Sequence, residues 1–166
     1  FKGASAVTMM NAARYDLVTL GNHEFDYGYA QLKENLKKAA FTVLCADVYL
    51  DETGETIYDP CTVVETGSGL KLGFFGMETP ETQMKVNPGL IQGVHFISNT
   101  GAAEETLYTC AQEQINALRS DGANIVIALA HLGVDAESAP DGHRSVDLYR
   151  NTEGIDLILE IGRAHV

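Results

Sequence analysis

The chain has 166 residues, of which 45% are hydrophobic, and its formal net charge is −12 at pH 7. The length fits one domain of ordinary size, and the hydrophobic content is enough for a buried core. The acidic balance, without any basic run, argues against binding to a nucleic-acid backbone. The sequence also contains no run of roughly 18–20 apolar residues, so we expect no membrane span.

The first third of the chain alternates predicted helices and strands. Apolar residues at helical spacing predict a helix over 2–14, and a run of apolar residues then predicts a buried strand over 15–20. A second amphipathic helix is predicted over 29–40 and a second buried strand over 41–48. A strand, a helix and a further strand form the βαβ unit that is typical of an α/β fold.

The rest of the chain predicts a hairpin, a long helix and two more core strands. In chain order we expect hairpin strands over 57–65 and 70–76, a connection over 79–93, a helix to Ser120, a strand over 125–130, a helical turn over 142–151 and a strand over 155–159. Asn99 or Thr100 is expected to cap the long helix, because such side chains accept hydrogen bonds from the first N–H groups of a helix.

A group of polar residues follows the first predicted strand, between Gly21 and Gly28. Asn22 offers an amide oxygen that suits a divalent cation, and His23 can bind a metal or donate a proton. Asp26 could fold back onto the His23 ring, where a carboxylate fixes the tautomer and favours the protonated form. The same residues could instead form a polar turn that caps the next helix. Because open α/β sheets bind ligands at the carboxyl ends of strands, we favour the chemical interpretation.

His131 repeats this placement directly after the strand predicted over 125–130. A lone histidine there is often structural, but with Asn22 at another strand end we favour a metal ligand. His95 and His143 lie in polar or loop contexts, and we expect both on the surface.

The eight residues 21–28, Gly-Asn-His-Glu-Phe-Asp-Tyr-Gly, resemble the signature of the 5'-nucleotidase family within the calcineurin-like metallophosphoesterases. Further similarity covers nearly the whole chain and runs through 79–82, 87–88, 129–133 and 154–159. It is nearest to bacterial secreted nucleotidases that also open 2',3'-cyclic nucleotides. The resemblance implies an α/β fold: a partial metallophosphoesterase sandwich with α-β-β-α layers, missing the first strands and the end of the domain.

The resemblance also implies a site with two divalent metal ions, such as Zn, Mn or Co. Asn22 and His131 would bind the same metal. His23, steadied by Asp26, would be the catalytic residue that stabilises the transition state and protonates the leaving alkoxide. Apart from the resemblance, our hypothesis for Glu24 is that it contacts these residues without binding a metal itself. The Asp-x-His and Gly-Asp motifs that bring further ligands in the family are absent here.

The last residues depart from the family pattern. Where the family has Gly-His-x-His, this chain has Gly162, Arg163 and His165, and an arginine cannot ligate a cation. The run from Glu160 onward also matches the translation of a common sequencing adapter. We therefore expect residues 1–160 to be a partial metallophosphoesterase domain and residues 161–166 to be a non-native tail, with no ligand role for His165.

The resemblance implies metal-dependent hydrolysis of nucleotide phosphate esters by the parent protein. A nucleotide or nucleotide-like small molecule would be the substrate, a separate C-terminal domain would bind the base, and the location would be extracellular, cell-surface or periplasmic in a bacterium. Because part of the ligand set is missing, we expect the chain alone to be inactive. One alternative is a related metallohydrolase acting on sugar-nucleotides, cyclic nucleotides or sulfur esters. Another is a non-catalytic α/β binding module that keeps the turn for structure.

Overall fold

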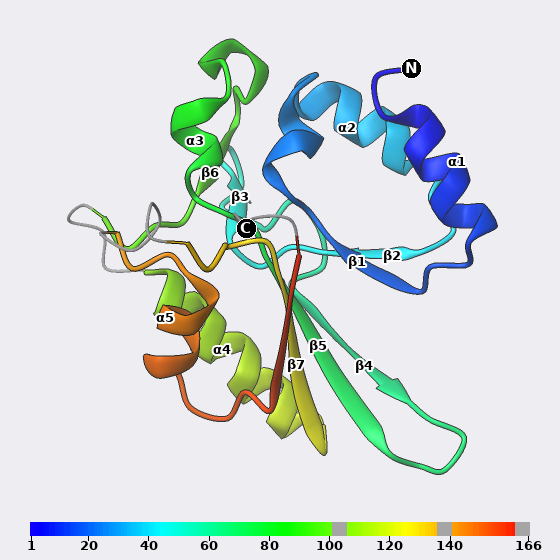
Figure 1. Ribbon diagram of the computed structural model, residues 1–166, viewed down its shortest axis with the longest axis vertical. Helices are drawn as coiled ribbons and strands as arrows, with labels where there is room; N and C mark the ends of the chain where they lie inside the picture. Colours follow the sequence, from blue (N-terminus) through cyan, green and yellow to red (C-terminus); the bar gives the residue numbers. More distant parts are fainter. Residues whose placement is uncertain (101–105, 136–140, 162–166) are drawn as a thin grey trace.

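The computed structural model describes residues 1–100, 106–135 and 141–161, and its largest sheet has four strands (Figure 1). In spatial order these are β4 (Cys61–Glu65), β5 (Lys71–Met77), β7 (Ile125–Ala130) and β8 (Leu157–Glu160). Strands β4 and β5 form an antiparallel hairpin, whereas β5, β7 and β8 run parallel. The carboxyl ends of these three parallel strands therefore share one edge of the sheet.

Two helices, α4 (Leu107–Ser120) and α5 (Ser145–Arg150), cover one face of this sheet (Figure 1). The apolar stripe of α4 buries Cys110, Ile115 and Leu118 completely or nearly so, and they belong to the same cluster as Phe75 and Val126 of the sheet. Among the described residues this cluster is one of two hydrophobic cores, and it confirms the amphipathic pattern expected for the long helix.

A second unit contains the parallel pair β1 (Leu17–Thr19) and β2 (Thr42–Leu44), with α1 (Ala4–Ala12) and α2 (Tyr29–Leu36) packed beside it (Figure 1). The 3₁₀ helix η1 (Asn22–Phe25) connects β1 to α2. The remaining elements are the antiparallel pair β3 (Val48–Leu50) and β6 (Val94–Phe96), the short helix α3 (Thr82–Lys85) and the 3₁₀ helix η2 (Pro88–Leu90). The helices and sheets confirm the predicted α/β class, as a partial sandwich.

The two units meet at Gly76 of β5, where the backbones approach closely. A Cβ atom built on Gly76 would lie 2.2 Å from the Leu44 carbonyl oxygen and 2.8 Å from the Thr19 hydroxyl. The Gly76 carbonyl in turn accepts a hydrogen bond of 2.9 Å from the Ala46 N–H. Only glycine leaves room for this contact, so Gly76 sets how the β1–β2 pair sits on the four-stranded sheet.

The prediction of a single strand over 41–48 is wrong. The chain leaves β2 after Leu44 and enters β3 at Val48, and these strands belong to different sheets. Asp47, only 1% exposed, explains the break: both of its carboxylate oxygens accept the backbone N–H of Glu78 at 3.0 Å. Burial raises the pKa of Asp47 to about 7.

Other predicted boundaries also change. The connection expected over 79–93 contains α3 and η2, and the strand β6 follows it without having been predicted. The long helix begins at Leu107 rather than near Thr100, with Thr106 as its N-cap. Asn99 nevertheless contributes a cap from a distance, because its side-chain oxygen accepts the N–H of Leu107 at 3.1 Å.

Candidate functional site

The structure brings two of the predicted ligands together at the strand ends. Asn22 follows β1 in the smaller unit and His131 follows β7 in the four-stranded sheet. The Asn22 Oδ1 atom lies 2.8 Å from the His131 Nε2 atom. Residues 109 positions apart therefore meet across the junction of the two units. Their convergence was expected, whereas their role as metal ligands stays a prediction.

The second pair of predicted residues lies on the same turn. His23 Nδ1 is 2.8 Å from Asp26 Oδ2, and the His23 side chain is 79% exposed. The carboxylate accepts the Nδ1 proton, which leaves Nε2 on the far side of the ring to face solvent or a substrate. This geometry fixes the orientation of the ring and leaves Nε2 available for proton transfer to a substrate.

The turn is anchored to the core by Phe25, which precedes Asp26 in the motif. Phe25 is fully buried and packs edge-to-face on Phe96, with ring centroids 5.1 Å apart. Gly28 then has φ of 89°, and a Cβ there would lie 3.2 Å from the Leu90 carbonyl oxygen. The buried ring and the permissive glycine explain why this local sequence forms a tight 3₁₀ turn and then starts α2.

The environment of His131 decides which of its ring nitrogens carries the proton. The Nδ1 atom lies 2.5 Å from the Ile161 carbonyl oxygen, which can only accept, so Nδ1 donates. In the neutral ring, Nε2 then presents a lone pair to the Asn22 amide oxygen, which is also an acceptor in the assigned orientation. A flip of the Asn22 amide would turn this 2.8 Å contact into an ordinary hydrogen bond, whereas in the assigned orientation a proton or a cation between the two atoms would be needed. At metal–ligand distances of about 2.1 Å this separation spans roughly 85° at a cation, close to a right angle.

This donor pair fits a divalent cation in type and spacing but supplies only one edge of a coordination shell. Within residues 1–100, 106–135 and 141–161, no group of three or more His, Cys, Asp or Glu side chains could hold a metal. His165 lies outside the described residues. The pair would therefore need ligands from elsewhere to complete a shell.

The two remaining histidines have different outcomes. His95 is exposed as predicted, and its Nδ1 lies 2.7 Å from Asp51 Oδ1 on another part of the surface. His143 was predicted on the surface, and this is wrong: it is 4% exposed. Its Nε2 lies 2.9 Å from the Ser98 hydroxyl and accepts the Asn99 N–H at 3.4 Å. These partners are distant in sequence, so local polarity gave no sign of the burial.

Gly21 and Glu24 contact the predicted site residues, although the sequence predicted little or no role for them. A Cβ on Gly21 would lie 2.9 Å from the His131 Cδ2 atom, so the imidazole rests on the bare backbone of Gly21. Glu24 Oε2 accepts the Gly21 N–H at 2.7 Å. A glycine followed three residues later by glutamate at the start of a helical turn is the sequence signal for such a bond.

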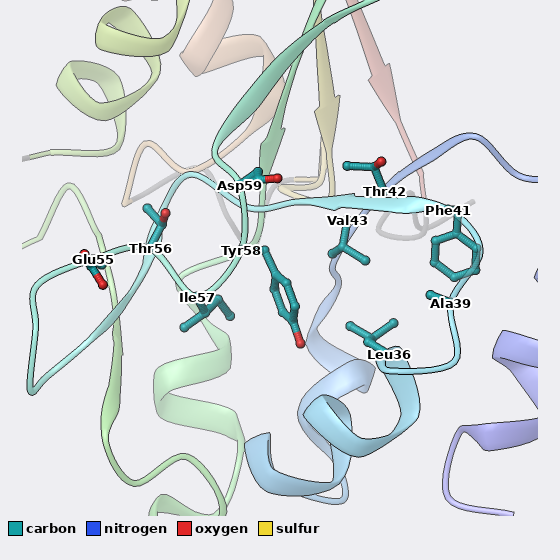
Figure 2. Close-up of a pocket in the computed structure, with 10 residues that line it drawn as sticks. All are labelled: Leu36, Ala39, Phe41, Thr42, Val43, Glu55, Thr56, Ile57, Tyr58 and Asp59. Atoms are coloured by element: carbon teal, nitrogen blue, oxygen red, sulfur yellow. The ribbon is translucent and has the colours of Figure 1, made fainter.

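Two hollows in the structure differ in their relation to this site. A groove of about 490 Å³ runs between β1 and the β7–β8 edge, and its walls include Gly21, Glu24, His131 and Leu159. A hollow of about 640 Å³ lies elsewhere, between β2, the end of α2 and residues 55–59 (Figure 2). The larger hollow is lined by none of the predicted site residues, so we do not connect it with the chemistry of the turn.

The sequence of the chain is similar to those of known nucleotide phosphoesterases. No family model matches the chain. The trifunctional nucleotide phosphoesterase YfkN of Bacillus subtilis (strain 168) is 31% identical over 169 residues, which cover 96% of this chain and 11% of YfkN. A snake venom 5'-nucleotidase of Crotalus adamanteus is 32% identical over 164 residues, covering 96% of this chain and 25% of the venom protein.

Solved structures give the fold family. The 5'-nucleotidase precursor of Thermus thermophilus matches with a TM-score of 0.77 and 31% identity, over 97% of this chain and 28% of that one. The structure titled calcineurin-like phosphoesterase YfkN from Bacillus subtilis matches with a TM-score of 0.75 and 31% identity, over 93% of this chain and 46% of that one. The chain has the fold of the calcineurin-like phosphoesterases. Its relatives are hydrolytic enzymes, and they include 2',3'-cyclic-nucleotide 2'-phosphodiesterases/3'-nucleotidases.

The match covers only part of the length of these phosphoesterases. The chain spans a quarter or less of YfkN and of the venom enzyme. No helix within the described ranges is long and apolar enough to cross a membrane.

Proposed function

We propose that this chain is part of a metal-dependent phosphoesterase that hydrolyses nucleotide phosphate esters in the manner of a 5'-nucleotidase. One observation carries the proposal: the Asn22–His131 contact of 2.8 Å stands next to the His23–Asp26 pair on the same turn. The names of the relatives, which include 5'-nucleotidases and a nucleotide phosphoesterase, support nucleotides as the substrate class.

His23 is proposed as the general acid. Asp26 holds its Nδ1 proton, so Nε2 can carry a second proton toward the leaving oxygen of the ester. An acid in this position contributes ~10²–10⁴-fold in rate. The exposure of the ring leaves this face open to a substrate.

Asn22 and His131 are proposed to hold one of two divalent cations through Oδ1 and Nε2. A bound divalent metal polarises the phosphoryl oxygen and lowers the pKa of water at that position. In a protein with net charge −12, such cations would also supply the positive charge that attracts a phosphate.

We further propose that residues 1–160 form a partial domain and need additional segments to complete the site. The groove between β1 and the β7–β8 edge supports this, because it exposes Tyr15 and Leu159 beside His131. The chain alone is then expected to bind Mn²⁺ or Co²⁺ weakly and to show no meaningful turnover. Robust phosphatase activity of the chain with either metal would contradict this part of the proposal.

The longer protein is the right sample for the activity test. His23→Ala is expected to lower kcat for 5'-nucleotide hydrolysis by ~10²–10⁴-fold without lowering the unfolding midpoint. His95→Ala is the matched control, since it removes another exposed histidine with an aspartate at 2.7 Å and should leave turnover unchanged. Unchanged turnover in His23→Ala would overturn the proposal and favour a structural role for the turn.

The same preparation addresses the range of substrates. Two of the relatives are named for cyclic nucleotides, which are the natural second substrate to test. We propose an extracellular, cell-surface or periplasmic location for the parent protein, in line with the venom relative. Fractionation of cells that express the longer protein would check this location.

A further inference from the structure

Glu24 makes a reciprocal pair of hydrogen bonds with Gly21. Its carboxylate accepts the Gly21 N–H at 2.7 Å, and its own N–H donates to the Gly21 carbonyl at 3.2 Å. Asn22 and His23 are the two residues enclosed by these bonds. A hydrogen bond to an ionised carboxylate is about twice as strong as a neutral one, so the bond made by the side chain is the stronger constraint on this ring.

The same glycine is the surface on which His131 rests. An added Cβ at Gly21 would be 3.0 Å from His131 Nε2 and 3.1 Å from Glu24 Oε2. The imidazole and the carboxylate therefore approach the Gly21 Cα from two sides. A shift of the Gly21 backbone would therefore move the Asn22 side chain and also the surface against which the His131 ring packs.

Neighbouring side chains of the turn have other contacts. Phe25 is buried against Phe96, and Asp26 binds His23. Neither of these contacts fixes the Leu20–Gly21 peptide. The Glu24 carboxylate does so through the Gly21 N–H, although the Glu24 residue itself is exposed.

We propose that Glu24 is a positioning residue: its carboxylate locks the Gly21 backbone so that Asn22 Oδ1 is held against His131 Nε2. The inference rests on the proposed function only for its consequence, the binding of a cation by that pair. The positioning itself is a property of the metal-free chain. Groups that orient ligands from outside the coordination shell typically change metal affinity 10–100-fold when removed.

The test compares Glu24→Ala, Glu24→Gln and the control Glu34→Ala in the metal-free chain by NMR. Glu34 is an exposed glutamate on α2 that pairs with Lys37 at 2.5 Å. Glu24→Ala should speed exchange of the Gly21 amide by about tenfold or more and remove the nuclear Overhauser contact between Asn22 and the His131 ring. Glu24→Gln should restore both, because its amide oxygen accepts the same bond. Glu34→Ala should match the wild type.

Titration with Mn²⁺, followed by broadening of the His131 ring signals, extends the test. Loss of affinity by 10–100-fold in Glu24→Ala, with recovery in Glu24→Gln, is the expected result. A wild-type-like Gly21 amide and His131 contact in Glu24→Ala would overturn the inference, and so would equal damage in Glu24→Gln. Absence of broadening in the wild type would instead contradict the proposed metal site, while the metal-free measurements would still decide the role of Glu24.

Discussion

Gly76→Ala is the sharpest test of how the two units of this fold are joined. The added methyl group would lie 2.2 Å from the Leu44 carbonyl oxygen and 2.5 Å from the Leu44 carbonyl carbon, whereas an ordinary contact begins at 3.4 Å. Because the obstacle is backbone, the β1–β2 pair must retreat by about 1 Å, which also stretches the bond from the Ala46 N–H to the Gly76 carbonyl.

The expected loss is about 3 kcal/mol, at the upper end of the range for overpacking. A domain of this size has only about 5–15 kcal/mol of stability in total. With a urea dependence of about 2 kcal/mol per molar, the unfolding midpoint should fall by roughly 1.5 M in an experiment monitored by circular dichroism.

Gly67→Ala is the matched control, since no atom lies within 4 Å of the Cβ it would add. Its midpoint should stay within the change expected for a neutral surface site, about 0.5 kcal/mol. If Gly76→Ala behaved like this control, the close approach of the two units at Gly76 would be refuted.

Two further perturbations test the site and the buried acid. Gly21→Ala should displace the His131 ring, since the new Cβ would lie 2.9 Å from its Cδ2 atom. We expect the Mn²⁺ affinity measured by NMR titration to fall tenfold or more. An unchanged affinity would contradict this prediction. Asp47 has a folded-state pKa of about 7 against about 3.9 in an unfolded chain. Its contribution to stability is therefore complete below about pH 4 and is lost as the pH rises through about 7. Asp47→Asn removes this titration, so the free energies of unfolding of variant and wild type, measured in urea, should diverge in favour of the variant by up to about 1.4 kcal/mol per pH unit across that window. Parallel pH profiles would refute the assignment.

The sequence predicted the local parts of the site well. The turn at Asn22, His23 and Asp26 depends on neighbours within a few residues, and the strand before His131 was predicted with its observed bounds. Both involve short-range patterns: a polar motif between glycines and an uninterrupted apolar run. The family resemblance, confirmed by the comparisons, then placed Asn22 and His131 together, which periodicity alone could not do.

The errors have a common physical cause in contacts between distant residues. The strand over 41–48 looked continuous because apolar residues surround Asp47, and the break depends on the N–H of Glu78, which follows β5. His143 looked exposed because its neighbours in sequence are polar, and its burial depends on Ser98 and Asn99. Such partners leave no periodic signal in the segment that contains the residue.

The two proposed ligands are carried by different units, with Asn22 after β1 and His131 after β7. An ion shared by these side chains would link the two units, in addition to the close backbone contact at Gly76. Its binding energy would then add to the free energy of unfolding, by about 2.7 kcal/mol at a free concentration one hundred times the dissociation constant. Chelation of the ion would thus lower the stability of the contact between the two units and also abolish the activity. The fall in the thermal unfolding temperature would report the affinity for the ion.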